Sequence, residues 1–311
     1  MRLVFLGSPP FATPILERLL SSERHEVLAL VTPPDRPRGR GRAVVRSALA
    51  EMADEAGVPV VQPASTKDPA FLEALASFEP EVLMVASYGE ILRRDVLELC
   101  PHGALNVHGS LLPRWRGASP IQRAIAAGDA ETGVSIQRMV LALDAGDVLL
   151  EKRTSIGPQE TAADLFERLS LLGADAAEEA LDLLAGGDAV HTPQDESLVT
   201  LAPKLTKDDG RIDFTLPAET VARHVRAMTT WPGARTTLPD GRDLVVLEAH
   251  PQETDGDEAP GTLLDDATLL VRTGDGGAVR LARVKPAGKA AMADDAFQRG
   301  ARVERGSTLG G

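Results

Sequence analysis

The sequence predicts an α/β protein with two domains: a doubly wound, mostly parallel, Rossmann-like sheet, followed by a small OB-like β-barrel. Three observations predict this fold class. The chain opens with a strand, a turn, a helix and a second strand, as doubly wound sheets do. Apolar strands and amphipathic helices then alternate as far as residue 187. Beyond residue 204, short strands are separated by Gly-containing turns, which is typical of small barrels.

Composition fits this picture. A length of 311 residues favours two domains, and 43% hydrophobic residues are enough for ordinary cores. The single cysteine, Cys100, excludes an intramolecular disulfide and fits a reducing compartment. The start of the chain reads as a first strand and not as a signal peptide, and no apolar run reaches the roughly 18 residues of a membrane span. We therefore expect a cytoplasmic enzyme with no membrane contact.

The first half of the chain supplies the sheet. Residues 2–6 form a strand, residues 12–20 a helix with Ile15, Leu16 and Leu19 on its apolar face, and residues 26–31 a second strand. The turn between them lacks G-x-G-x-x-G, so no dinucleotide fingerprint is present. The elements that we expect next are a loop at 32–42, a helix at 46–56, a strand at 58–61, a helix at 68–78 and a strand at 82–87.

An arginine-rich loop interrupts this pattern. The net charge of −13 argues against general affinity for nucleic acid, but the charge is unevenly distributed. Residues 36–46 hold no acid and five arginines: Arg36, Arg38, Arg40, Arg42 and Arg46. Guanidinium groups suit phosphate, so the loop is a candidate phosphate-binding segment. Taken alone, it reads equally well as solvated surface.

The most informative stretch follows an apolar strand at 103–107. Residues two apart on a strand share a face, so Asn106 and His108 should project together at the strand end. A turn at 110–117 and a helix at 118–127 come next. Open α/β sheets place their chemistry in loops that follow strand ends.

This pair of side chains suits one kind of chemistry. An Asn amide donates to an oxygen that becomes negative, and His can carry a proton near neutral pH. No Ser or Cys lies beside a base in this stretch, which favours direct transfer through a tetrahedral intermediate over a covalent acyl-enzyme. A lone His at a strand end is more often a hydrogen-bonded structural residue, so the pair alone leaves both interpretations open.

The stretch from Asn106 to Gln122 resembles the signature of folate-dependent formyltransferases. The resemblance implies a catalytic triad of Asn106, His108 and Asp144, the last within a Leu-Asp-Ala-Gly-Asp segment. It also implies that a turn and a second loop bind the folate. The residues concerned are Ser110, Leu111, Leu112 and Pro113 in the turn and Tyr88, Gly89, Ile91 and Leu92 in the loop. For Tyr88, a place in the core is an equally good interpretation.

The rest of the first domain frames Asp144. We expect a strand at 134–143, a loop holding Asp144, a strand at 148–156 and a helix at 161–184. Asp144 and Asp147 could form a weak metal site, but no other ligands cluster nearby, so we expect no metal. The domains expected are a catalytic domain at 1–187, a linker at 188–203 and a C-terminal barrel at 204–311.

The C-terminal domain begins with a segment, 204–214, that is similar to the opening of the second domain in these formyltransferases. A helix at 218–228 follows. The short strands that we expect are 243–249, 261–264, 268–273 and 278–284. Residues 306–311 are expected to be disordered.

The resemblance implies a reaction and partners. A formyl group would pass from 10-formyltetrahydrofolate to the α-amine of methionine on initiator tRNA. Arg36, Arg38, Arg40 and Arg42 would bind the tRNA, and the barrel would assist. We expect a monomer. Two enzymatic alternatives remain, transfer to another amine such as a sugar nucleotide or hydrolysis of the donor; a non-enzymatic alternative is an RNA-binding module.

Overall fold

The computed structural model describes residues 1–38 and 43–310, with the main chain alone for 36–38, 43 and 44. The chain divides into two compact units. The first unit consists of Met1–Pro120, Glu131–Ser155 and Phe166–Ala202. The second unit consists of Ile121–Ala130, Ile156–Leu165 and Pro203–Gly311.

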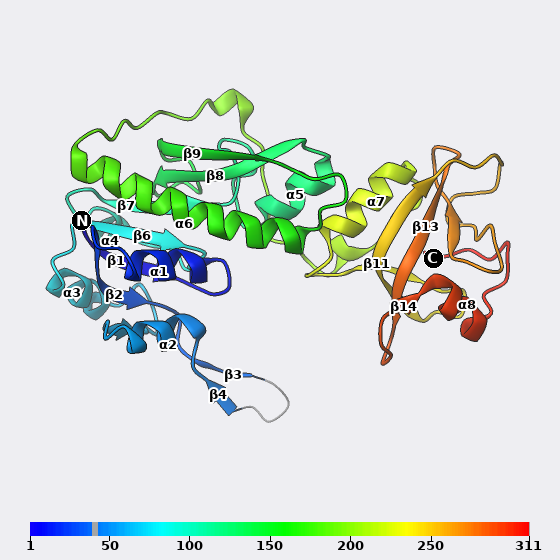
Figure 1. Ribbon diagram of the computed structural model, residues 1–311, viewed down its shortest axis with the longest axis horizontal. Coiled ribbons are helices and arrows are strands. Elements are labelled where there is room, and N and C mark those ends of the chain that lie inside the picture. Colours follow the sequence, from blue (N-terminus) through cyan, green and yellow to red (C-terminus); the bar gives the residue numbers. More distant parts are fainter. Residues whose placement is uncertain (39–42, 311) are drawn as a thin grey trace. The chain divides into compact units, whose positions relative to one another are not determined.

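The first unit is built on a seven-stranded sheet in the order β5-β2-β1-β6-β7-β8-β9 (Figure 1). Its strands are β1 Arg2–Gly7, β2 Glu26–Val31, β5 Val60–Val61, β6 Val82–Ala86, β7 Ala104–His108, β8 Glu131–Arg138 and β9 Val148–Ser155. Only the β7/β8 and β8/β9 pairs are antiparallel. The predicted doubly wound, mostly parallel sheet is confirmed. The strand order turns back between β1 and β6, where such sheets place their sites.

Helices cover both faces of this sheet because its central strands are apolar on both sides. Alternate residues of β1 and β6 join a core with α3 (Pro69–Ser77) and α4 (Arg94–Leu97). On β7, Val107 faces α6 (Ala162–Gly186), where Gly173 leaves no side chain between the helix and the strand. The same glycine lies against Ile15 of α1 (Ala12–Leu20). Helix α2 (Ala48–Glu55) begins after Ser47, whose hydroxyl accepts a hydrogen bond from Ala50 N.

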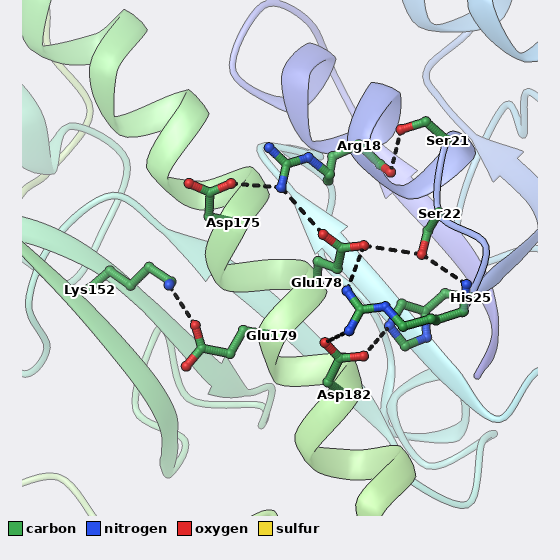
Figure 2. Close-up of polar contacts among 10 residues, drawn as sticks. Arg18, Ser21, Ser22, His25, Lys152, Asp175, Glu178, Glu179 and Asp182 are labelled. Atoms are coloured by element: carbon green, nitrogen blue, oxygen red, sulfur yellow. Dashed lines mark hydrogen bonds and ion pairs between the residues drawn. The ribbon is translucent and has the colours of Figure 1, made fainter.

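Charged side chains join α6 to α1 and to the segment that follows α1 (Figure 2). Glu178 of α6 accepts from Arg18, Ser22 and Arg24, and Asp182 pairs with Arg24. The ring of His25 is buried beneath them, with Nε2 3.1 Å from Oδ1 of Asp182. Several charges sharing partners hold a helix more firmly than isolated surface pairs do.

Two local predictions in this unit are wrong. The strand expected at 134–143 is β8, Glu131–Arg138, and residues 139–147 form a loop. Leu141 and Leu143 are exposed there, so their apolar character does not mark a strand. In the segment expected to be a loop, β3 (Arg36–Arg38) pairs antiparallel with β4 (Ala43–Val45). Here the backbone pairing of the two segments overrides the preference of Pro37 for irregular structure.

The second unit contains an antiparallel sheet in the order β10-β11-β13-β12, with β14 on β13. Its strands are β10 Ala234–Thr237, β11 Asp243–Gln252, β12 Leu270–Arg272, β13 Ala278–Pro286 and β14 Met292–Ala293. Its helices are α5 Pro120–Ala127, α7 Ala218–Ala227 and α8 Asp294–Ala301. Short 3₁₀ turns occur at Glu196–Leu198 in the first unit and Asp208–Gly210 in the second. The curved antiparallel sheet confirms the small barrel-like domain.

Residues 306–310 are ordered, contrary to expectation, and Gly311 lies outside the described residues. Leu309 is 1% exposed, and its backbone N–H donates to the carbonyl of Gly261. Gly310 N–H donates to Thr237, and Gly306 N–H donates to Leu263. The segment expected as a strand at 261–264 makes only isolated bridges, to Thr308 and Val271. One buried leucine and these backbone bonds outweigh the flexibility that Gly and Ser suggest.

Cys100 is buried, and burial raises the pKa of its thiol to about 12. A thiol that stays protonated is a poor nucleophile, so Cys100 serves as a small apolar core residue.

In the described part of the chain, no helix has the length and apolar character needed to cross a membrane.

Candidate active site

Strand β7 positions two of the expected catalytic residues. Asn106 and His108 lie two residues apart on β7 and therefore on the same face of the sheet. The side chain of His108 is 6% exposed. Its Nε2 lies 3.0 Å from the carbonyl oxygen of Trp115. Because a carbonyl only accepts, Nε2 carries the proton of this bond and Nδ1 faces the other way.

Asp144 completes the group. Its Oδ1 is 3.5 Å from Nδ2 of Asn106, and its Oδ2 is 3.7 Å from Nδ1 of His108. The backbone of Asp144 has φ 48°, in the left-handed region that costs a non-glycine residue energy. The structure thus brings together the three side chains that the resemblance implied, around one carboxylate that is 12% exposed.

Two further groups, which the sequence did not reveal, hold this carboxylate. Nε2 of Gln137 donates to Oδ1 of Asp144 at 2.8 Å, and the backbone N–H of Gly117 donates to Oδ2 at 2.8 Å. Gln137 reaches this position because β7 and β8 pair in a register that places it opposite Asn106. Gln137 could have been identified only from the antiparallel register of β7 with β8, and no local sequence pattern encodes that register.

The arrangement supports oxyanion and proton chemistry. Asn106 offers a neutral amide donor, His108 offers a ring nitrogen that can gain or release a proton, and Asp144 is a fixed acceptor beside both. In the described residues, no group of three or more His, Cys, Asp or Glu side chains could hold a metal ion.

The turn after β7 is held by its own hydrogen bonds. The hydroxyl of Ser110 donates to Arg114 O at 2.7 Å. Leu112 N–H donates to the hydroxyl of Ser135 at 3.0 Å, and that hydroxyl donates to Ser110 O at 2.8 Å. Ser110 and Leu112 are buried, whereas Leu111 and Pro113 are partly exposed. The main chain of the turn is thereby fixed at the end of β7.

The loop after β6 divides its expected folate-binding residues into two pairs. Tyr88 and Leu92 are each 4% exposed and belong to the core beneath the sheet. Burial, with the nearby charge of Glu90, raises the pKa of Tyr88 to about 12. Gly89 is exposed with φ 80°, and Ile91 is 81% exposed. Of the two interpretations of Tyr88, the structure supports the core residue.

The arginine-rich segment is described only in part. Arg40 and Arg42 lie outside the described residues, as do the side chains of Arg36 and Arg38. The base of the β3/β4 hairpin is described: Oδ1 of Asp35 accepts from Ser47 N at 3.0 Å and from Gln62 Nε2 at 3.0 Å. Hydrogen bonds that the flanking chain donates to Asp35 thus hold the point where the hairpin leaves the sheet.

Comparisons with known proteins agree with this geometry. The family described as formyl transferase matches residues 1–181, and its C-terminal domain matches residues 204–302. A methionyl-tRNA formyltransferase of Anaeromyxobacter dehalogenans (strain 2CP-1 / ATCC BAA-258) is 45% identical over 98% of both chains. A second, from Geotalea daltonii (strain DSM 22248 / JCM 15807 / FRC-32), is 40% identical over 100% of this chain and 98% of that protein.

Among solved structures, HypX from Aquifex aeolicus in complex with tetrahydrofolic acid matches with a TM-score of 0.64 and 22% identity. The match covers 98% of this chain but 48% of that chain, so this chain spans about half of HypX. At this identity the likeness shows the fold alone. The family matches and the full-length relatives carry the assignment: the chain belongs to the formyl transferase family, among the methionyl-tRNA formyltransferases.

Proposed function

We propose that the chain transfers a formyl group from 10-formyltetrahydrofolate to the α-amino group of methionyl initiator tRNA. Full-length relatives bear the name of this activity, and both parts of the family match the chain. The observation that carries the proposal is the carboxylate of Asp144, which contacts Asn106 and lies beside His108. The substrates place the reaction in the cytoplasm.

The reaction begins with the neutral amine of methionine, which attacks the formyl carbon and forms the new C–N bond. The carbonyl oxygen becomes an oxyanion, which the amide of Asn106 stabilises, as does the ring of His108 once its Nδ1 has gained the proton of the amine. The bond between the formyl carbon and the folate nitrogen then breaks. The proton lost by the amine reaches that nitrogen by way of His108 and Asp144, through an intervening water. Charge and atoms balance without a metal or a covalent enzyme intermediate.

The donor would lie along the edge formed by the turn after β7 and the loop after β6. Gly89 and Ile91, which are exposed, and the accessible parts of Leu111 and Pro113 support this placement. The buried residues of the two segments would fix the backbone against which the donor lies. They are Ser110 and Leu112 in the turn after β7, and Tyr88 and Leu92 in the loop after β6.

The acceptor would be bound elsewhere. We infer that Arg36, Arg38, Arg40 and Arg42 engage tRNA phosphates, since guanidinium groups suit phosphate and the segment holds no acid. Residues 1–187 would form the catalytic domain and residues 188–203 a connecting segment. Residues 204–311 would be the domain that assists tRNA binding.

A single assay tests the proposal. The purified chain is incubated with 10-formyltetrahydrofolate and charged initiator tRNA, and formyl-methionine is scored after hydrolysis of the ester. Parallel reactions replace the tRNA with an amino sugar nucleotide or with buffer alone. Formyl-methionine is the expected product. Formylation of the sugar amine, or donor hydrolysis with no formyl-methionine, would replace the proposal with the corresponding alternative.

A further inference from the structure

Residues 191–202 are extended except for the 3₁₀ turn Glu196–Leu198, and we call them the strap. The strap lies against the turn after β7 and the loop after β8 that carries Asp144. Thr192 exchanges backbone hydrogen bonds with Val148 at the start of β9. At the other end, Arg116 N–H donates to Thr200 O at 2.9 Å, and Ala202 N–H donates to Arg116 O at 2.8 Å. All of these residues belong to the first unit. Backbone hydrogen bonds therefore hold the strap near both of its ends, to β9 at one end and to the turn after β7 at the other.

Gln194 lies in the middle of the strap and reaches the loop of Asp144. Its Nε2 donates to the main-chain carbonyl of Asp144 at 2.8 Å and to that of Gly146 at 2.7 Å. Its Oε1 accepts from Nε of Arg116 at 3.0 Å. Only this orientation of the amide gives both carbonyls a donor and the guanidinium an acceptor. One side chain thus ties together the strap, the turn after β7 and the loop after β8.

Arg116 is itself fixed. Its guanidinium is 7% exposed and makes two bonds to Glu196 of the strap, at 3.2 and 2.8 Å. A bidentate pair of this kind sets the plane of the guanidinium. The pair with Glu196 therefore fixes both the position and the orientation of Arg116 Nε, which donates to Gln194.

Gln137 and Gly117 hold the carboxylate of Asp144, but the backbone of the loop that carries it has few contacts of its own. Val140, Leu141 and Leu143 are 44, 59 and 70% exposed, so the loop gains little from burial. Its ends meet where Arg138 N–H donates to Asp147 O at 2.9 Å. Asp144 sits at a positive φ that its neighbours must enforce. Hydrogen bonds from outside the loop are the means by which this conformation is kept.

We propose that Gln194 is a positioning residue for Asp144: by binding the carbonyls of Asp144 and Gly146, it keeps the carboxylate aimed at Asn106 and His108. The proposal rests on the proposed function, because it assumes that Asp144 takes part in formyl transfer. Gln194 contacts the backbone of the loop and not the carboxylate. It acts on the rate of chemistry and leaves the tRNA-binding surface unchanged.

Loss of the Gln194 amide leaves two main-chain carbonyls without a donor and Arg116 Nε without an acceptor. The loop then relaxes from the conformation with positive φ, and the carboxylate moves. A displacement of about 1 Å at a reacting group can cost about 10²-fold in rate. Gln194→Ala should therefore lower kcat about 10- to 100-fold, with the KM for tRNA within about 2-fold of the wild type.

A double-mutant cycle with Asp144→Asn tests this mechanism. If Gln194 works through the Asp144 carboxylate, adding Gln194→Ala to Asp144→Asn should lower kcat by less than about 3-fold more. Additive losses would overturn the proposal, as would a single variant with the kcat of the wild type. Gln194→Glu, which keeps the size and the contact to Arg116 but loses the donors, should match Gln194→Ala; if Gln194→Ala does not fold, the cycle is run with this variant.

Gln298 offers a matched control in the second unit. It is 3% exposed, and its Nε2 also donates to two main-chain carbonyls, those of Thr268 and Val303. Gln298→Ala should lower the melting temperature without coupling to Asp144→Asn. The same coupling for both glutamines would mean that lost stability, and not positioning, explains the effect. If the wild-type protein formylates no methionyl-tRNA, the proposed function itself is refuted. That result would be known before any variant is made, so it is distinguishable from failure of the Gln194 proposal.

Discussion

The imidazole of His108 faces the carboxylate of Asp144, with Nδ1 3.7 Å from Oδ2. This separation is longer than a hydrogen bond, so proton transfer between the two groups would need an intervening water or a closer approach. The carboxylate meanwhile keeps hydrogen bonds of 2.8 Å to Gln137 and Gly117. The site is therefore organised around a carboxylate that is anchored by neutral donors and faces its histidine across a short gap.

Asp144→Asn should lower kcat at least about 100-fold, because the variant keeps the size of the side chain but loses the acceptor charge beside His108. Steady-state rates of methionyl-tRNA formylation measure the change. Thermal unfolding should show that the variant is folded. A kcat close to that of the wild type would remove Asp144 from the mechanism.

Asn106→Ala should lower kcat about 10²- to 10³-fold, the usual loss when one oxyanion donor is removed. The KM for tRNA should change little, because Asn106 acts on the formyl oxygen. Asn106→Asp is the matched control: it keeps the shape without the donor and should be as slow. Retention of activity in the Asp variant would mean that donation by Asn106 is not needed.

Arg42→Ala should weaken the use of tRNA and lower the slope of log K against log salt by about 1. Binding of initiator tRNA is measured at several salt concentrations. Arg94→Ala serves as the control, since Arg94 is an exposed arginine of α4 that pairs with Glu98. Equal slopes for the wild type and Arg42→Ala would mean that Arg42 makes no phosphate contact.

His25 should make the first unit less stable as the pH is lowered. Burial is the main cause that lowers the pKa of its ring, and Asp182 opposes the shift (Figure 2). A lowered pKa in the folded state favours the neutral ring, so stability is greatest above about pH 6.5, the unfolded value, and declines as the pH falls below it. Melting temperatures between pH 7.5 and 5 record this decline.

His25→Gln should be less sensitive to pH over the same range, with a difference of about 2 °C or more in the shift of the melting temperature. Gln can still donate to Asp182, so the network of Figure 2 keeps its hydrogen bond. His250→Gln, at an exposed histidine of the second unit, is the control. An unchanged pH dependence in His25→Gln would assign the decline to other groups.

The sequence was sufficient for the features that depend on local periodicity. The strand and helix alternation predicts the first unit, and the two-residue spacing predicts that Asn106 and His108 share a face. Asp144 lies 38 residues from Asn106 in the sequence, and only the family resemblance connected them. Nothing in the local pattern around Asp144 distinguishes it from an ordinary turn residue.

The remaining features depend on contacts between distant segments. Gln137 meets Asp144 through the register of β7 with β8, and Gln194 meets it through the path of the strap. The predicted C-terminal end of β8 is wrong because exposed leucines in the following loop resemble strand residues in the sequence. The sequence predicts a disordered segment around Leu309 because composition does not show which backbone partners a segment will find.

The order of these contacts along the chain has a consequence for biosynthesis. Every residue that contacts Asp144 directly lies before residue 195, whereas the second unit is complete only when residues 306–310 have paired with Leu263, Gly261 and Thr237. A chain synthesised from its N-terminus can therefore assemble the candidate site around Asp144 early. Residues 121–130 must wait for partners beyond residue 203, so incomplete folding during synthesis would be concentrated in the second unit.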